Sequence, residues 1–405
     1  MPHSALIRPI RDWLMDQSLG EPDIVGLFEE LCTRLTAIGV PVTRGRLIWQ
    51  TLHPLFKSER VMWDCGRQSS LDQFPHQDGE TKEWTDSPLR YVLENNLKLF
   101  RRRLTGPDAM VDFPMLEELR DDGFTDYLVM VTSMQTMDIK SEVATAKPRG
   151  ILVSWATNRE HGFSDDDLTA LQSIQRVLAV LCKSVIQSRI SENIATTYLG
   201  LRAGRNVLDG QIRRGDGQET HAVVWYSDLR NSTMFAETLE ASDYFSMLNA
   251  YFEVTAGSLV EHGGEVLDFI GDAVLGIFPY EDERELEDAS ARATAALDNT
   301  LSLGRENNVE REKQGLDRYN FGVGLNVGAL KFGNIGIPQR LSFSVIGSTV
   351  NEVARIEEMT KLLQQPVLSG GKLAQLHPER WKSVGEHKLD GVLDPVELYA
   401  FKQAS

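Results

Sequence analysis

Hydrophobic and polar residues follow two different periods along this chain, and these periods predict the order of its helices and strands. In residues 22–39 the apolar positions recur at helical spacing. A second helix is predicted over residues 164–188, with Ser164 as its N-cap and three aspartates in its first turn. Three short apolar or β-branched runs predict strands: residues 47–52, 126–133 and 149–155.

In the second half of the chain, two acidic residues stand where predicted strands end. The run AVVWYSD ends in Asp228, and a helical pattern begins at Ala236. Further on, the runs EVLDFI and AVLGIF flank Gly271 and Asp272. A two-residue loop with glycine first predicts a type II′ hairpin, which places Asp272 at its tip.

Composition and charge narrow the class of protein. A length of 405 residues predicts two or three domains, and 41% hydrophobic with 25% charged residues is typical of soluble globular proteins. The net charge of -17 argues against a nucleic-acid or anionic-membrane surface. It does not exclude a nucleoside triphosphate, because metal ions can supply the local positive charge.

No apolar run reaches the ~18–20 residues of a membrane helix. The N-terminus lacks the features of a signal peptide, and the three cysteines are far apart, so a cytoplasmic protein is expected.

The first part of the chain is expected to be a regulatory domain, residues 1–190. Its segment RGILVSWAT, followed by GFSDDDLTALQSIQRVLAVL, resembles the last strand and helix of GAF-like sensor domains. The resemblance implies an α+β domain with an antiparallel sheet flanked by helices, and a small-molecule effector as a candidate partner. A packing or dimerising domain without a ligand is the alternative. Residues 191–219 are expected to be a linker or transducer, and residues 220–405 a second domain.

Asp228 and Asp272 together have the chemistry of a site for phosphoryl-type transfer. Such a reaction needs cations that bridge the triphosphate oxygens and lower the pKa of the attacking hydroxyl group, and two Mg²⁺ ions held by shared carboxylates are a recurrent solution. The backbone N–H groups where a strand passes into a helix also suit phosphate oxygens.

Four motifs in this half of the chain occur in the order found in class III adenylyl and guanylyl cyclases, which the chain resembles over roughly residues 220–400: VVWYSDLRNST, GGEVLDFIGDAVLGIFP, FGVGLNVGALKFGNIG and FSVIGSTVNEVARIE. The resemblance implies an α+β, ferredoxin-like βαββαβ catalytic domain that pairs head to tail. A homodimer with active sites at its interface is therefore expected. The implied reaction is the two-metal-assisted conversion of a nucleoside triphosphate to a cyclic nucleotide and pyrophosphate.

The resemblance also implies roles for individual residues. Asp228 and Asp272 would bind two Mg²⁺ or Mn²⁺ ions in each active site, with the backbone carbonyl of Leu229 as a further ligand. Asn351 would position the ribose, and Arg355 would stabilise charge on the transferring phosphate. Their i,i+4 spacing places them on one face of a helix. The triphosphate loop would comprise Asn231, Ser232 and Thr233, with Ser232 where the family usually has phenylalanine.

The identity of the base is open at the sequence level. The two base-reading positions of the family correspond to Asp268 and Ser344. Asp268 is a lone acid in an otherwise apolar strand, where a buried carboxylate needs a partner. A carboxylate can accept hydrogen bonds from guanine N1–H and N2–H₂, whereas the hydroxyl of Ser344 matches bacterial adenylyl cyclases. ATP is the leading prediction and GTP the runner-up; a pyrimidine triphosphate and an ion pair of Asp268 with an arginine or lysine stay open.

A second departure from the family concerns the cationic contact to the triphosphate near the C-terminus. The corresponding region near Glu397 is acidic, and Lys388 and Arg340 are the nearby basic candidates. A degenerate cyclase domain that acts as a nucleotide-binding regulatory dimer is therefore the non-enzymatic alternative.

Overall fold

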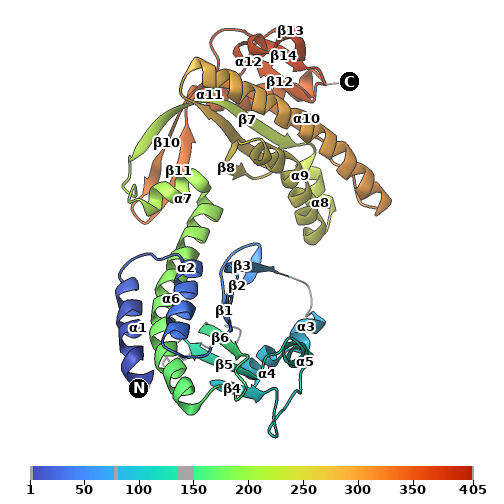
Figure 1. The fold of residues 1–405 in the computed structure, drawn as a ribbon. Helices are drawn as coiled ribbons and strands as arrows, with labels where there is room; N and C mark the ends of the chain where they lie inside the picture. The colour runs from blue at the N-terminus through green and yellow to red at the C-terminus, as the bar shows by residue number, and fades with distance from the viewer. Residues whose placement is uncertain (1–2, 77–80, 135–149, 404–405) are drawn as a thin grey trace. The chain divides into compact units, whose positions relative to one another are not determined.

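The computed structural model describes residues 3–76, 81–134 and 150–403. The chain divides into two compact units, Met1–Ile194 and Ala195–Ser405, and the division falls within one long helix, α6 (Asp165–Leu199) (Figure 1). Each unit has one sheet covered by helices, which confirms the predicted α+β class. Within the described ranges, no helix carries an apolar stretch long enough to cross a bilayer.

The first unit contains a six-stranded antiparallel sheet whose strands lie in the order β3-β2-β1-β6-β5-β4. Its strands are β1 (Arg44–Gln50), β2 (Phe56–Asp64), β3 (Ser70–Pro75), β4 (Leu99–Arg103), β5 (Asp126–Ser133) and β6 (Gly150–Thr157). Side chains alternate between the two faces of a strand. On β5, Leu128 and Met130 therefore join one hydrophobic cluster, and Tyr127 and Val129 join the other.

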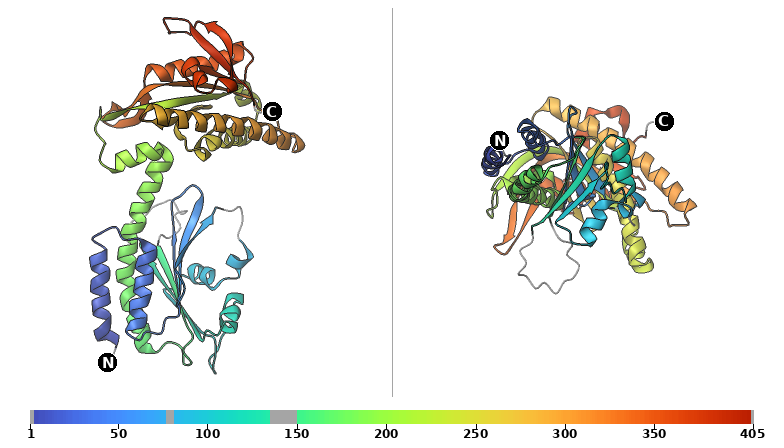
Figure 2. Two further views of the ribbon diagram at one scale, coloured as in Figure 1. Left: turned by 45° about the horizontal axis from the view of Figure 1, so that its top comes forward. Right: turned by 60° about the horizontal axis from the view of Figure 1, so that its bottom comes forward.

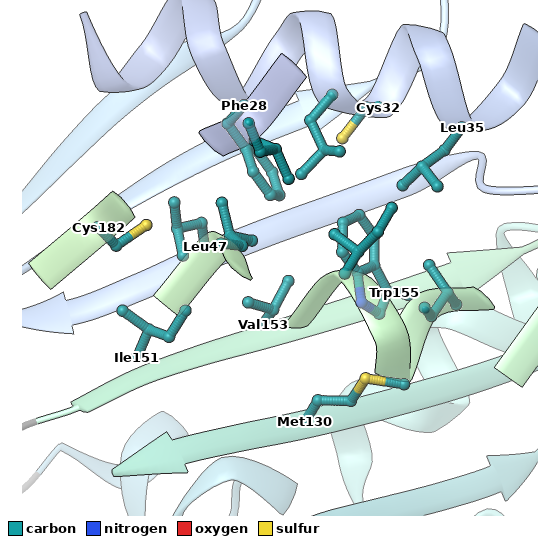
Figure 3. Packing of buried hydrophobic residues seen from close by; sticks show 14 of the residues in the cluster. Phe28, Cys32, Leu35, Leu47, Met130, Ile151, Val153, Trp155 and Cys182 are labelled. Atoms are coloured by element: carbon teal, nitrogen blue, oxygen red, sulfur yellow. The ribbon is translucent and has the colours of Figure 1, made fainter. Parts of the chain in front are cut away.

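Helices cover both faces of this sheet, as the left view in Figure 2 shows. The larger cluster lies under α1 (His3–Gln17), α2 (Ile24–Ala37) and α6, and the smaller one under α4 (Pro88–Glu94) and α5 (Pro114–Asp121); α3 (Lys82–Thr85) precedes α4. In the larger cluster Phe28 of α2 stacks on Trp155 of β6 with 5.6 Å between ring centroids (Figure 3). This antiparallel sheet between helices is the architecture expected of a GAF-like domain, and assignment to that family stays a prediction.

Helix α6 starts where the sequence predicts but is longer. Ser164 Oγ accepts the N–H of Asp167, and the Asp167 carboxylate accepts the Ser164 N–H at 2.7 Å, the reciprocal pattern of a capping box. The predicted end at residue 188 is wrong, because the polar residues that follow contain no helix breaker. The helix ends before Gly200, which adopts a φ of 85°. The first part of the expected linker, residues 191–219, is therefore helical.

The second unit contains an eight-stranded sheet in the order β13-β14-β12-β10-β7-β9-β8, with β11 paired to β10. Its strands are β7 (Gly217–Leu229), β8 (Glu265–Ile270), β9 (Ala273–Tyr280), β10 (Phe321–Ile337), β11 (Arg340–Ile346), β12 (Val367–Gly370), β13 (Trp381–His387) and β14 (Val396–Phe401). Its helices are α7 (Leu201–Leu208), α8 (Ser232–Thr238), α9 (Ala241–Glu261), α10 (Glu283–Lys313), α11 (Ser348–Leu362) and α12 (Gly371–Leu376), and a 3-10 turn spans Pro378–Arg380. The run β7-α9-β8-β9-α10-β10 has the predicted βαββαβ order.

The two faces of this sheet carry different helices. On β7, Trp225 packs in a cluster with α9 and α10, whereas Val224 packs in a cluster with Val353 of α11. The same alternation continues to the end of β7, where Tyr251 of α9 donates a hydrogen bond to Ser227 at 3.0 Å. Asp228, the next residue, therefore belongs to the face that α11 covers.

Candidate active site

The sheet register brings the two predicted metal aspartates together. Asp228 lies opposite Ala273 on β9, and Asp272 directly precedes Ala273. Ile270 pairs with Ala273, so Gly271 and Asp272 form the predicted two-residue loop. Gly271 has a φ of 65°, as the first position of a type II′ turn requires. Two strand ends that are far apart in sequence thus present their carboxyl groups to each other.

The surroundings of this carboxyl pair disfavour the charged form of Asp228. Burial, followed by the charge and hydrogen bond of Asp272, raises the pKa of Asp228 to about 6, although Lys361 and Arg230 oppose the shift. One carboxylate oxygen of Asp272, Oδ2, is buried and has no hydrogen-bond partner. Two such groups repel each other when both are ionised. A cation bound between them would stabilise the charged state of both.

A divalent cation with oxygen ligands fits these residues. The unpartnered Oδ2 of Asp272 and the repulsion between the two carboxylates are what such an ion would satisfy. Among the described residues, no group of three or more His, Cys, Asp or Glu side chains is close enough to bind a metal. Other ligands would therefore be a backbone carbonyl, water or phosphate, a combination that suits Mg²⁺. Leu229 is buried and directly follows Asp228, and its carbonyl stays the predicted further ligand.

The predicted triphosphate loop lies directly after the end of β7. Asn231 adopts a left-handed conformation with a φ of 62°, and α8 begins at Ser232. Asn231 and Thr233 are exposed, and Ser232 is half-buried. The first backbone N–H groups of a helix have no intrahelical partner. This loop therefore places free N–H donors within a few residues of Asp228.

Three residues near Asp228 are not predicted from the sequence. Lys361 Nζ of α11 lies 3.8 Å from Asp228 Oδ2. Glu357, only 2% exposed, lies one turn earlier on α11, and burial raises its pKa to about 7, partly offset by Arg230. The guanidinium group of Arg230 donates to Thr360 and lies 3.7 Å from Glu357. The available signal was the helical spacing that places Glu357 and Thr360 on the buried face of α11.

Asn351 and Arg355 lie on a different face of α11. Asn351 is exposed, and Arg355 forms an ion pair with Glu358 at 2.6 Å. At 100° per residue, Asn351 and Arg355 share one side of the helix, and Glu357 is about 160° from Arg355. The described part of the chain has no hydrogen bond or ion pair between either of them and Asp228 or Asp272. Within one chain, Asp228 and Asp272 therefore lie together, whereas Asn351 and Arg355 do not lie with them.

The expected burial of Asp268 is wrong. Asp268, Phe269 and Ile270 are exposed at the end of β8, an edge strand, because a strand with one neighbour leaves its last residues open to solvent. The region that the structure describes offers Asp268 no arginine or lysine partner. Ser344 is half-buried on β11, where it pairs with Gly333 of β10. Strands β10, β7 and β9 lie between β11 and β8, so the sheet does not make the two predicted base-reading residues neighbours.

The region near Glu397, where the family has a cationic contact to the triphosphate, is acidic and exposed. Glu397 on β14 accepts a hydrogen bond from Ser383 of β13 at 2.7 Å, and both side chains are exposed. Lys388 and Arg340 are also exposed. Neither forms an ion pair with Glu397 in the described residues.

Comparison with known proteins identifies this domain. Residues 217–390 match the family model described as the adenylate and guanylate cyclase catalytic domain. The second unit contains a class III nucleotidyl cyclase domain. The match includes Asp228, Asp272, Asn351 and Arg355, and the description of the family names both purine nucleotides.

The curated relatives are similar to the cyclase part of the chain. An adenylate cyclase of Anabaena cylindrica is 29% identical over 151 residues, which cover 37% of this chain and 29% of that protein. An uncharacterized protein of Mycobacterium tuberculosis is 30% identical over 213 residues, covering 49% of this chain and 36% of that protein. The chain spans about a third of the length of these relatives.

Solved structures also match only part of this chain, although the match covers nearly all of their own length. The guanylyl cyclase Cya2 is 28% identical and covers 47% of this chain and 95% of its own, with a TM-score of 0.41. The adenylyl cyclase CyaB of P. aeruginosa is 23% identical and covers 47% of this chain and 97% of its own, also with a TM-score of 0.41.

Proposed function

We propose that this chain is an adenylate cyclase that converts ATP to 3′,5′-cyclic AMP and pyrophosphate, and that its first unit regulates the reaction. The observation that carries this proposal is the pair Asp228 and Asp272, which meet at two strand ends with an unpartnered, buried carboxylate oxygen. A cyclase domain that only binds nucleotide has no need to retain such a repulsive pair. The Anabaena cylindrica relative, an adenylate cyclase, supports the choice of ATP.

In the proposed reaction the ribose 3′-oxygen attacks the α-phosphorus in line. The bond from the α-phosphorus to the bridging oxygen breaks, pyrophosphate leaves, and the 3′-hydroxyl proton is lost to solvent. When bound, Mg²⁺ or Mn²⁺ supplies positive charge to the triphosphate oxygens and lowers the pKa of the 3′-hydroxyl. Asp228 and Asp272 hold this charge beside the loop at Asn231, whose N–H groups orient the triphosphate.

Asn351 and Arg355 act on the same reaction from a second chain. Their side of α11 is exposed, and they make no contact with the aspartates of their own chain. In a homodimer with head-to-tail domains, Asn351 of one subunit orients the ribose bound at the Asp228 site of the other. Arg355 stabilises the charge that develops on the phosphate, since a guanidinium presents several donors to such an oxyanion.

GTP is the second candidate substrate, and the exposure of Asp268 favours it. An exposed carboxylate without an ionic partner is available to a base, and it can accept both the N1–H and the N2–H₂ of guanine. Adenine offers a carboxylate only its exocyclic amine. Ser344 is the residue of this chain that would favour adenine.

The deciding experiment incubates the purified full chain with Mg²⁺ or Mn²⁺ and each of the four nucleoside triphosphates, and identifies the products by mass. Cyclic AMP as the main product is expected, and Asp272→Ala should abolish it without unfolding the protein. Cyclic GMP as the main product would replace ATP by GTP. No cyclic product from any of the four would favour a nucleotide-binding regulatory dimer.

A further inference from the structure

A buried polar cluster connects the inner face of α11 with the end of β7. It consists of Arg230, Glu357 and Thr360, and the last two are only 2% and 1% exposed. A buried carboxylate is costly unless it is paired and hydrogen-bonded. Glu357 therefore depends on its partners in the cluster, Arg230 and Thr360.

The contacts within the cluster join all three side chains. Arg230 Nη2 donates to Thr360 Oγ1, and Arg230 Nη1 lies 3.7 Å from Glu357 Oε1. Thr360 Oγ1 lies 3.2 Å from the same Glu357 oxygen. Arg230 and Thr360 are 130 positions apart in sequence. A strand end and a helix far along the chain are thus fixed to each other at one point.

The cluster is next to the metal aspartate. Gly322 on β10 lies directly opposite Asp228 in the sheet register. A Cβ atom on Gly322 would overlap Glu357 Oε1, Arg230 Nη2 and Thr360 Oγ1. The side chains of the cluster therefore occupy the space that a residue paired with Asp228 would otherwise fill.

Arg230 is also held through its backbone. Its N–H donates to the carbonyl of Asn320 at 2.8 Å, and the next residue, Asn231, leaves the strand conformation with a φ of 62°. Only Leu229 separates Arg230 from Asp228. Anchoring both the backbone and the guanidinium group of Arg230 fixes the peptide that contains the Leu229 carbonyl, and it restricts the backbone of Asp228.

We propose that Glu357, acting through Arg230 and Thr360, is a positioning residue that holds Asp228 and the Leu229 carbonyl in the geometry for binding a divalent cation. This role rests on the proposed function only in that the cation serves nucleotide cyclisation. Groups that orient metal ligands from the second layer change metal affinity by about 10–100-fold when they are removed. Breaking a buried ion pair also leaves its partner uncompensated, so loss of Glu357 leaves the Arg230 guanidinium without its charge partner.

The test compares two ion pairs of the same unit. Glu357→Gln keeps the shape of the side chain and removes its charge. Arg380→Ala is the control, because Arg380 binds both oxygens of half-buried Asp298 at 2.7 Å and has no contact with the carboxyl pair. Mn²⁺ binding to each full-length variant is measured without nucleotide by electron paramagnetic resonance, and cyclisation kinetics are measured against metal concentration. Thermal unfolding confirms that each variant is folded.

Glu357→Gln should weaken Mn²⁺ binding about tenfold and raise the half-saturating metal concentration in the activity assay by a similar factor. Its kcat at saturating metal should stay within about threefold of wild type, since Glu357 does not touch the substrate. Arg380→Ala should keep the wild-type Mn²⁺ affinity even though it loses stability. Wild-type Mn²⁺ affinity in folded Glu357→Gln overturns the positioning role. If that variant does not fold, Thr360→Val applies the same criterion.

The outcomes separate this role from the proposed function. A wild-type chain that binds Mn²⁺ but forms no cyclic nucleotide refutes the cyclase activity, and the comparison of Glu357→Gln with Arg380→Ala still decides the positioning role. An active wild-type enzyme with an unaffected Glu357→Gln variant refutes the positioning role alone. A wild-type chain that binds no Mn²⁺ overturns the metal site and the positioning role together.

Discussion

Replacing Asp272 by asparagine should stabilise the metal-free protein while abolishing its response to metal. The structure sets the size of the effect. The pKa of Asp228 is raised from 3.8 to about 6, first by burial and then by Asp272. A shift of about two pH units corresponds to about 3 kcal/mol. The Asp228 side chain is 26% exposed, so solvent screening reduces this figure, and only part of it comes from Asp272. Asp272→Asn should therefore raise the free energy of unfolding of the metal-free protein by about 1 kcal/mol.

The pH dependence of this gain follows from the direction of the shift. Between pH 3.8 and about 6 the folded state binds more protons at Asp228 than the unfolded state, so wild-type stability falls as the pH rises through this window. The advantage of Asp272→Asn is therefore full above about pH 6 and disappears towards pH 4. For a unit of this size, about 1 kcal/mol corresponds to a Tm increase of about 2–4 °C.

The assay is thermal unfolding at pH 8 in EDTA and then with Mn²⁺. At about 100 times its dissociation constant, Mn²⁺ should stabilise the wild-type cyclase domain by about 2.7 kcal/mol, and the transition that moves with Mn²⁺ identifies that domain. The Tm of Asp272→Asn should be higher than that of wild type in EDTA, and Mn²⁺ should raise it little. Asp268→Asn, at an exposed position of the same hairpin, is the control and should match wild type in both conditions. An Asp272→Asn protein that melts lower than wild type in EDTA, or that Mn²⁺ still stabilises fully, would refute the reasoning.

Three further predictions concern the dimer and the first unit. Mixing inactive Asn351→Ala and Asp272→Asn chains should restore up to about a quarter of wild-type activity, because half of the dimers are mixed and each mixed dimer has one intact site. No recovery of activity after subunit exchange would contradict active sites built from two subunits. Burial acts to raise the pKa of Asp64, but the hydrogen bonds and charges of two arginines of β1 outweigh it and lower the pKa below its usual value. Asp64→Asn should therefore destabilise the first unit by about 1–2 kcal/mol at pH 7. This difference should vanish as the pH falls below the folded pKa, as denaturant unfolding at several pH values would show. Arg189→Ala removes the ion pair at 3.0 Å to buried Glu59 and should lower the free energy of unfolding by about 1–2 kcal/mol, measured by urea titration.

Local patterns in the sequence predicted much of the fold because the elements concerned depend on nearby residues. The strand predicted at 126–133 has the bounds of β5, and Ser164 caps α6 as its position indicates. The end of α6 was not predictable in this way. Its apolar spacing fades after Ile186, but the polar residues beyond are tolerated in a helix until Gly200.

The candidate site divides in the same way. Asp228 and Asp272 could be placed at strand ends because the strand period and a two-residue hairpin loop are local features. The exposure of Asp268 could not be predicted in this way, since the apolar run around it is the same whether β8 is a central or an edge strand. The order of strands in the complete sheet determines which of the two it is. Glu357 was not predicted because its partner Arg230 follows a strand that is distant in sequence, and no sequence spacing records that contact.

The geometry of α11 adds a structural argument to the dimer that the family resemblance implies. The buried side of the helix is fixed to β7 and β10 of its own chain. A Cβ atom on Gly324 would meet the backbone of Val353 and Glu357 at less than 3 Å, so the helix lies close against the strand. At 100° per residue, Asn351 is about 120° from Glu357, so bringing Asn351 to the Asp228 of the same chain would require α11 to turn by about a third of a revolution and would break the contacts of Glu357. In the proposed dimer, the exposed side of α11 therefore serves the site of the other subunit. For this reason Asn351→Ala should lower kcat by about 100-fold or more while leaving the Mn²⁺-dependent Tm increase of the chain unchanged. A loss of that increase would place Asn351 at the metal site of its own chain, against the packing of α11.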